Sequence, residues 1–263
     1  MTATDDRAIG DDNRQHACDE AESLATSRDR LTELSDDDRW DVRMCVASNP
    51  RTPSDTLHTL SNDAYPEVRE WVAANPSADT ADVVWLAGDP DYIVRSYTAG
   101  NPRLPQELFD EMVRDPDPEI RASVGICERL TEDQYEALAL DEDAEVRHSI
   151  ATNPFTPPHV LAWLTYEVDT EVLLEALKHP TMPAEALEEA GDRYLGLGNE
   201  AYALAIANNP SCPAEIALWV LSPEPEDIVA HLEEGSLSSR VTEFLLQHES
   251  PLIREVAWQE LNL

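Results

Sequence analysis

The segment "DAYPEVREWVAANP" at residues 63–76 decides the fold, because "DEDAEVRHSIATNP" at residues 141–154 repeats it closely. When the sequence is read in steps of 26 residues, the acidic residue that opens the segment recurs without a gap. Coincidence does not produce so many matched columns at one spacing, so each copy is one structural repeat. The acidic column consists of Asp37, Asp63, Asp89, Asp115, Asp141 and Glu167.

Each repeat predicts two short helices, and the first covers residues 66–74. Val68 and Val72 lie four residues apart there, so one face of the helix is apolar. The proline that opens this helix suits a first turn, where its missing N–H would have no partner. The Asn-Pro step at residues 75–76 ends the helix, because the residue before a proline avoids the helical region.

The second helix of the repeat is predicted from its capping residues. The dipeptide Thr-Pro stands at residues 52–53 and again at 156–157. We expect the threonine hydroxyl to cap the free N–H groups and the proline to take the first helical position. Where the proline is missing, Thr131 and Gln134 predict a capping box. No segment shows the sustained alternation of a half-buried strand, so we predict an all-α protein.

The shortness of these helices predicts that the repeats stack. Helices of about ten residues are marginal alone, because nucleation is costly. Each repeat therefore covers the apolar face of the one before it, which builds the continuous core of an α-solenoid. A column of mostly small residues lets neighbouring helices approach closely. Its members are Ala47, Ala73, Ala99, Gly125, Ala151 and Leu177.

The domain organisation follows from how well each copy keeps the pattern. The copies match best over residues 37–166 and are degenerate over residues 167–263, where an insertion lies near 191–199. We expect one solenoid domain of about eight repeats over residues 16–263.

The N-terminal end of the array has its own prediction. Residues 26–35 match a second helix but have no convincing first helix before them, as expected of a cap. Residues 1–15 are polar and acidic, and we predict that this tail is disordered.

The pattern D-x4-V-R-x2-V-A-x-N-P-x-T-P-x3-L-x2-L resembles the leucine-rich repeat variant family, over residues 26 to about 222. The resemblance implies a right-handed superhelix of alternating α and 3₁₀ helices, with a wider kinship to HEAT-type solenoids. It implies a binding function without naming a partner. One branch of the family carries an N-terminal cysteine cluster for an iron–sulfur centre. Only Cys18 precedes the array here, so no cofactor is expected.

The formal net charge of the chain is −36, from 54 acidic and 18 basic residues. Such a field repels phosphate backbones and anionic lipids, so we expect neither nucleic-acid nor membrane partners. Three explanations of the acidity stay open: solubility or a salty cytoplasm, a basic partner, and mimicry of DNA. The first residues show no signal peptide and no apolar run approaches about 20 residues, so we expect a cytoplasmic location.

Metal and catalytic motifs are missing from the sequence. The seven histidines show no metal-ligand spacing, and the cysteines form no CxxC pair, so no metal site is predicted. Isolated cysteines on helices usually behave as small buried hydrophobes. No GxSxG motif or glycine-rich phosphate loop occurs, and we predict no catalytic residue. The cysteines are Cys18, Cys45, Cys127 and Cys212.

Two polar columns are predicted to be structural ladders. The arginine column either grips an acidic ligand or pairs with acids of its own or the adjacent repeat, and the forked guanidinium favours pairing. The asparagine column can satisfy backbone groups exposed where the first helix stops. The ladder residues are Arg43, Arg69, Arg95, Arg121 and Arg147, and Asn49, Asn75, Asn101, Asn153 and Asn209.

Five aromatic residues are candidate contacts for a partner, because interfaces favour tryptophan. Three share one place on the second helix, and two share a position on the first helix. Packing between repeats is the alternative for all five. The candidates are Trp71, Trp85, Tyr97, Trp163 and Trp219.

The sequence therefore favours a non-enzymatic scaffold that binds a protein or peptide, basic in view of the charge of the chain. The alternatives are an architectural or regulatory subunit of a larger complex and a divergent HEAT-like enzyme accessory protein. An enzyme needs titratable groups that converge in a pocket, whereas a binding scaffold needs an aromatic groove rimmed with acid. The sequence leaves the oligomeric state open.

Overall fold

The structure is a computed structural model that describes residues 15–194, 199–221 and 225–262. Within these residues every regular element is a helix and no strand occurs, which confirms the expected all-α class. Residues 1–14 of the predicted disordered tail lie outside the described part, and residue 15 lies in a helix. Among the described helices, none combines the length and apolar character that crossing a bilayer requires.

The chain divides into two compact units, an N-terminal unit that ends at Cys127 and a C-terminal unit that begins at Glu128. Each unit is built from successive two-helix repeats and is described by itself. The expectation of a single domain over residues 16–263 stays a prediction.

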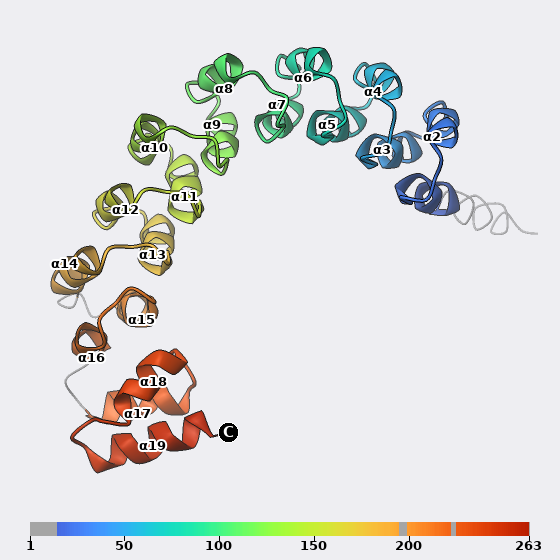
Figure 1. The fold of residues 1–263 in the computed structure, drawn as a ribbon. Coiled ribbons are helices and arrows are strands. Elements are labelled where there is room, and N and C mark those ends of the chain that lie inside the picture. Colours follow the sequence, from blue (N-terminus) through green and yellow to red (C-terminus); the bar gives the residue numbers. More distant parts are fainter. Residues whose placement is uncertain (1–14, 195–198, 222–224, 263) are drawn as a thin grey trace, which may run out of the picture. The chain divides into compact units, whose positions relative to one another are not determined.

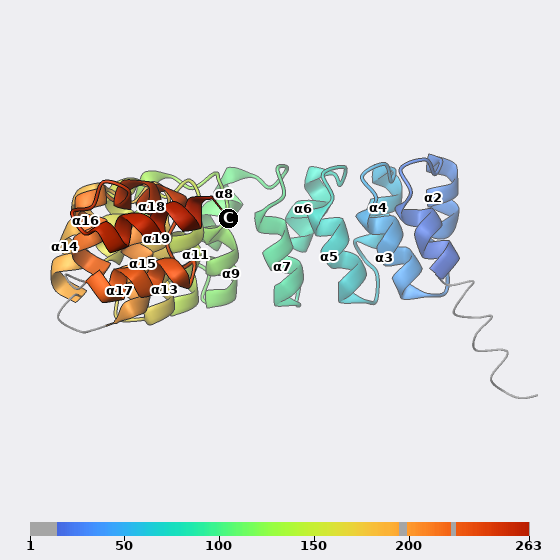
Figure 2. The ribbon, with the colours of Figure 1, turned by 90° about the horizontal axis from the view of Figure 1, so that it is seen from below.

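The N-terminal unit arranges its helices in two layers (Figure 1). A helix at residues 15–22 precedes the others, so the repeat that we expected to lack a first helix has one. Its remaining helices are α2 (Arg28–Leu34), α3 (Trp40–Ser48), α4 (Ser54–Leu60), α5 (Pro66–Ala74), α6 (Thr80–Leu86), α7 (Tyr92–Ala99), α8 (Gln106–Met112) and α9 (Pro118–Gly125). The first helices α3, α5 and α7 lie side by side in one layer, and the second helices α4 and α6 lie in the other (Figure 2).

The C-terminal unit continues the alternation of first and second helices and ends on α19, which begins at Pro251 after Ser250 as the sequence predicts. Its helices are α10 (Glu132–Ala139), α11 (Ala144–Thr152), α12 (Pro158–Leu164), α13 (Thr170–Lys178), α14 (Ala184–Tyr194), α15 (Glu200–Asn208), α16 (Ala214–Leu221), α17 (Pro225–Glu233), α18 (Ser239–Leu245) and α19 (Pro251–Leu261).

The core of each unit consists of the repeated apolar columns. Val68 of α5 and Val94 of α7 are fully buried, and so are Val42 of α3 and Ile120 of α9. Ala73 and Ala99, from the small-residue column, are also fully buried. A methyl side chain at this place lets the next first helix pack closely, so the columns predicted from the sequence are the layers of the core.

The second helices are α-helices, whereas the family resemblance implies 3₁₀ helices at this place. The backbone N–H of Leu57 donates to Pro53 O at 3.0 Å, and that of Ser61 donates to Leu57 O at 2.8 Å. Both bonds span four residues, which is the α-helical spacing. The predicted capping box of Thr131 and Gln134 is confirmed at the start of α10.

The predicted threonine caps of the second helices are wrong. Pro53 is the N-cap of α4, and no side chain caps this helix. The buried Thr52 hydroxyl donates instead to the carbonyl of Val46 at 2.6 Å, and Thr156 donates to Ile150 O at the same distance. The last carbonyls of a helix lack partners within the helix, so the hydroxyl satisfies the end of the first helix rather than the start of the second.

The insertion predicted near residues 191–199 lengthens a helix. α14 has 11 residues, against 7 in the equivalent α12. The four additional residues of α14 make about one helical turn. Residues 195–198 of the predicted insertion lie outside the described residues.

Candidate binding surface

Arginine side chains join successive repeats through forked ion pairs. Arg43 donates from Nε and Nη2 to the two carboxylate oxygens of Asp63, at 2.6 and 3.0 Å. Its Nη1 donates to the carbonyl of Asp37 at 2.8 Å. Each guanidinium therefore links the start of its own repeat to the start of the next. The same fork joins Arg69 to Asp89 and Arg147 to Glu167.

The carboxylates of this ladder are charged despite their burial. Burial acts to raise the pKa of Asp63, but the pKa is lowered, because the hydrogen bonds from Arg43 and from the Tyr65 N–H act together with the charges of Arg43 and Arg69. The pKa of Glu167 is lowered for the same reasons, with Arg147 as the donor. The arginines are therefore held by buried negative charge and are not available to grip an acidic ligand.

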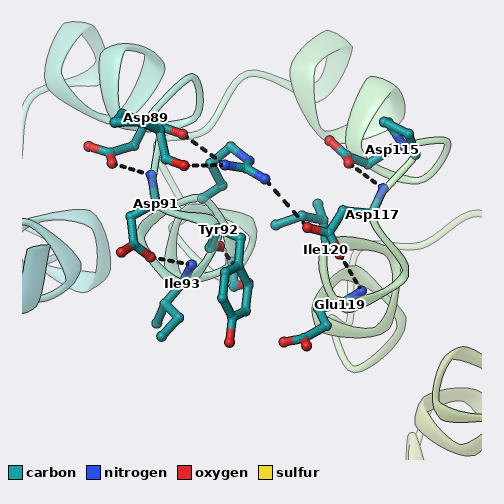
Figure 3. Close-up of polar contacts among 12 residues, drawn as sticks. Asp89, Asp91, Tyr92, Ile93, Asp115, Asp117, Glu119 and Ile120 are labelled. Carbon is teal, nitrogen blue, oxygen red and sulfur yellow. Dashed lines mark hydrogen bonds and ion pairs between the residues drawn. The ribbon is translucent and has the colours of Figure 1, made fainter.

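The ladder changes partner at Arg95. Its Nη1 donates to Asp89 O at 2.9 Å, as the other arginines do at their own repeats. Its Nη2, however, lies 3.6 Å from Asp117 rather than pairing with Asp115. Asp117 also accepts the Glu119 N–H at the start of α9 and so caps that helix (Figure 3).

The asparagine column bridges neighbouring first helices from buried positions. Asn75 is 2% exposed, and its Nδ2 donates to Ala47 O at 2.6 Å and to Asn49 O at 2.9 Å. Its Oδ1 accepts the backbone N–H of Ser77 at 2.8 Å. One side chain thus satisfies the end of the preceding first helix and the turn after its own. Asn49, Asn101 and Asn209 make the same three contacts, and Asn153 accepts in the same way from Phe155 N.

Histidine takes the asparagine place in one repeat of the C-terminal unit. His179 is buried, and its Nε2 donates to Asn153 O at 3.0 Å. Its Nδ1 accepts from Thr181 N at 3.3 Å, so the ring is neutral with the proton on Nε2. Burial lowers the pKa of His179.

We expect His179→Asn to reduce the loss of stability on mild acidification. Because the folded-state pKa is lowered, the unfolded chain binds more protons, and stability falls as the pH drops below about 6.5. In urea unfolding between about pH 7.5 and 5.5, the free energy of unfolding of the variant should rise relative to that of the wild type as the pH falls. A pH-independent difference would contradict the prediction.

His58→Asn is the matched control for that experiment. The exposed His58 lies 2.6 Å from Asp82, and its hydrogen bond to this carboxylate raises the pKa of the histidine. A raised folded-state pKa stabilises the protein below the unfolded pKa. The free energy of unfolding of this variant should therefore fall relative to that of the wild type as the pH falls.

The five candidate aromatic residues do not form one surface. Trp71 and Tyr97, on α5 and α7 in the first-helix layer, have ring centroids 6.3 Å apart and are 39% and 40% exposed. Trp85, 65% exposed, is on the second helix α6. Trp163 and Trp219 belong to the C-terminal unit. The ring of Trp163 packs edge-on against His159. The ring of Trp219 packs so closely on Gly191 that a Cβ at that glycine would clash with it.

The aromatic pair of the first-helix layer is flanked by carboxylates. Glu67 and Glu70 precede Trp71 on the same turns of α5 and are both half-buried. One carboxylate oxygen of Glu67, Oε2, is buried without a hydrogen-bond partner. Burial, followed by the charges of Asp91 and Glu67, raises the pKa of Glu70. We name Glu67, Glu70, Trp71, Asp91 and Tyr97 the acidic aromatic surface.

A second aromatic residue beside this surface also meets a carboxylate. Tyr92, at the start of α7, is 40% exposed, and its hydroxyl points toward Glu119 of α9 (Figure 3). The charge of Glu119 raises the pKa of Tyr92. Exposed rings and carboxylates therefore alternate along the first helices α5, α7 and α9.

Comparison with known proteins identifies the repeats. Residues 43–95 match the family described as Leucine Rich Repeat Variant domain. Over these residues the chain is similar to leucine-rich repeat variants. A solved structure titled "A leucine-rich repeat variant with a novel repetitive protein structural motif" is 25% identical, with a TM-score of 0.54 over 79% of this chain and 80% of that chain. A crystal structure of an engineered protein is 15% identical over 94% of both chains, but its TM-score of 0.36 carries no argument. No curated protein matches the sequence.

Two cysteines of the N-terminal unit are bonded, which the sequence analysis missed. Cys18 and Cys45 form a disulfide, with their Cα atoms 5.6 Å apart. This separation is ordinary for a disulfide. The bond ties the helix at residues 15–22 to α3. Sequence spacing offered no signal, because the two cysteines are 27 residues apart and neither belongs to a repeated column.

Three side-chain clusters in the described residues bring metal-ligating residue types together, but the sulfur atoms of one cluster are already joined in the Cys18–Cys45 disulfide. Each has at least one exposed carboxylate, and the structure shows no feature that singles any of them out as a metal site. The clusters are Cys18 with Glu22 and Cys45, Glu132 with Glu136 and His159, and Glu200 with His231 and Glu234.

One further ladder arginine, in the last described helix, was missed. Arg254 of α19 donates from Nη1 to His248 O and Glu249 O, at 2.6 and 2.8 Å, as Arg147 does to the carbonyls that open its own repeat. The signal was present in the sequence: Pro251-Leu-Ile-Arg repeats Pro66-Glu-Val-Arg.

Proposed function

We propose that this protein is a non-enzymatic scaffold that binds a basic protein segment or peptide on the acidic aromatic surface of its N-terminal unit. The family and fold are those of repeat scaffolds. One observation carries the proposal: Trp71 and Tyr97 are exposed neighbours in the first-helix layer, next to two half-buried glutamates.

The charge of the chain favours a basic partner over a neutral or acidic one. A net charge of −36 steers cations toward the protein and repels anions. Aromatic rings supply contact area with little loss of conformational entropy, and they attract cations through their faces. Carboxylates beside rings therefore suit the side chains of arginine and lysine.

A peptide titration tests the proposal. Fluorescence anisotropy with labelled nonapeptides of arginine, lysine and glutamate should show binding of the basic peptides, weakened at high salt. The variant with Trp71→Ala and Tyr97→Ala should lose roughly tenfold or more in affinity for a basic peptide.

The matched control is Trp85→Ala, which removes a more exposed tryptophan from a second helix of the same unit. Its affinity should stay within about twofold of the wild type. Equal losses from both variants, or no loss from either, would show that the peptide is held by net charge alone and would contradict the proposal.

A further inference from the structure

We infer that the acidic aromatic surface contains a binding site for one arginine side chain of the partner, held by Glu67 and Glu70 and covered by Trp71 and Tyr97. This inference rests on the proposed function and specifies the chemistry of its partner.

One carboxylate oxygen of Glu67 lacks a hydrogen-bond donor. Its Oε2 is removed from water and has no hydrogen-bond partner within the described residues. A buried carboxylate oxygen without a partner is unfavourable, and a cation that donates to it relieves the desolvation. The side chain as a whole is only half-buried, so part of Glu67 faces the solvent from which a donor of the partner would come.

Glu70 adds a second carboxylate to this site. It lies one helical turn after Glu67 and is half-buried, and burial, followed by the charges of Asp91 and Glu67, raises its pKa although the nearby Arg69 acts to lower it. The ladder arginines have their carboxylates already: Arg69 pairs with Asp89, and Arg95 lies 3.6 Å from Asp117. An arginine of a partner would therefore add a cation that is not already paired with another carboxylate of the ladder.

The protein itself shows which cation fits carboxylates beside rings. Arg43 binds Asp63 in a fork while its guanidinium carbon lies 5.7 Å from the ring centroid of Tyr65. In the C-terminal unit, Arg193 lies 3.6 Å above the ring of Tyr166. Arg193 donates to the carbonyl of Thr165 at 2.8 Å, whereas Arg43 combines a ring with a carboxylate. The planar group of arginine stacks on a ring and donates two parallel bonds, as lysine does not.

The site should therefore discriminate between basic side chains. An arginine nonapeptide should bind at least about fivefold more tightly than a lysine nonapeptide of equal charge. A citrulline nonapeptide, which keeps the shape of arginine but loses its charge, should not bind measurably.

The variant test uses Glu67→Gln and Glu70→Gln, separately and together. Each keeps the size of the side chain and removes its charge, and the double variant should bind the arginine peptide roughly tenfold more weakly. Glu107→Gln is the matched control, because Glu107 is exposed and occupies the same position on the second helix α8 as Glu67 does on α5. It should change the affinity by less than about twofold, the general effect of one lost charge.

The outcomes separate the inference from the proposed function. If the Trp71→Ala and Tyr97→Ala variant loses binding but Glu67→Gln and Glu70→Gln match Glu107→Gln, the arginine site is wrong and the binding surface stands. Equal affinity of the wild type for the arginine and lysine peptides also overturns the arginine site. That comparison needs no variant, so it decides the question even if a glutamine variant fails to fold.

Discussion

Arg69→Met should lower the free energy of unfolding by about 3–5 kcal/mol, because it leaves a buried carboxylate without its cation. Asp89 is 6% exposed and receives both forked bonds of Arg69, at 2.8 and 3.0 Å. Nη1 of the same arginine also donates to Asp63 O at 2.7 Å. Urea unfolding followed by circular dichroism measures the change.

Two further variants give this result its meaning. Arg30→Met removes an exposed arginine that also forms ion pairs, with Glu20 and Glu33, and should cost only a small part of the Arg69→Met effect. Adding Asp89→Leu to Arg69→Met should restore much of the stability, because the unpaired charge is then gone. Similar losses from Arg30→Met and Arg69→Met would mean that burial of the ladder does not matter.

Asn75→Ala should also destabilise the N-terminal unit, by about 2–5 kcal/mol, since it removes three hydrogen bonds and leaves two backbone groups without partners. These groups are the carbonyl of Ala47 and the N–H of Ser77, whereas Asn49 O still accepts the N–H of Thr52 at 3.0 Å. Water reaches them poorly, because Asn75 itself is 2% exposed. The same urea experiment measures the effect.

Asn62→Ala is the matched control for the asparagine column. Asn62 is exposed, and its side chain donates to His58 O over a long distance of 3.3 Å. Asn62→Ala should therefore change the free energy of unfolding by no more than about 0.5 kcal/mol. Asn75→His should recover part of the stability lost in Asn75→Ala, because His179 makes one of the two carbonyl bonds at the equivalent place. If Asn75→Ala and Asn62→Ala behave alike, the column has no special role in stability.

The repeat could be recognised in the sequence because each copy packs against its neighbours in the same way. A residue that fills the core in one repeat fills it in the next, so Val68 and Val94, or Ala73 and Ala99, stand 26 residues apart. Polar columns obey the same rule, and an arginine and the acid that opens the next repeat are 20 residues apart. Periodicity thus exposes every contact that is made once per repeat.

Contacts made only once leave no periodic signal. The Cys18–Cys45 disulfide and the Arg95–Asp117 contact depend on the relative placement of two particular helices, and spacing does not reveal them. Thr52 was assigned to the wrong helix for a related reason. A hydroxyl between two helices can satisfy the end of one or the start of the other, and only the three-dimensional path of the turn decides which.

The sequence alone determined the helical repeat, its two-helix content and its buried columns, because burial follows hydrophobic period and needs no knowledge of distant contacts. The candidate site was decided by the tertiary structure. Trp71 and Trp85 look equivalent as exposed aromatics of one repeat, yet they lie on different helices, and only Trp71 has the ring of Tyr97 beside it. A partner surface forms where side chains of successive repeats converge, and convergence is set by how helices pack rather than by the order of residues.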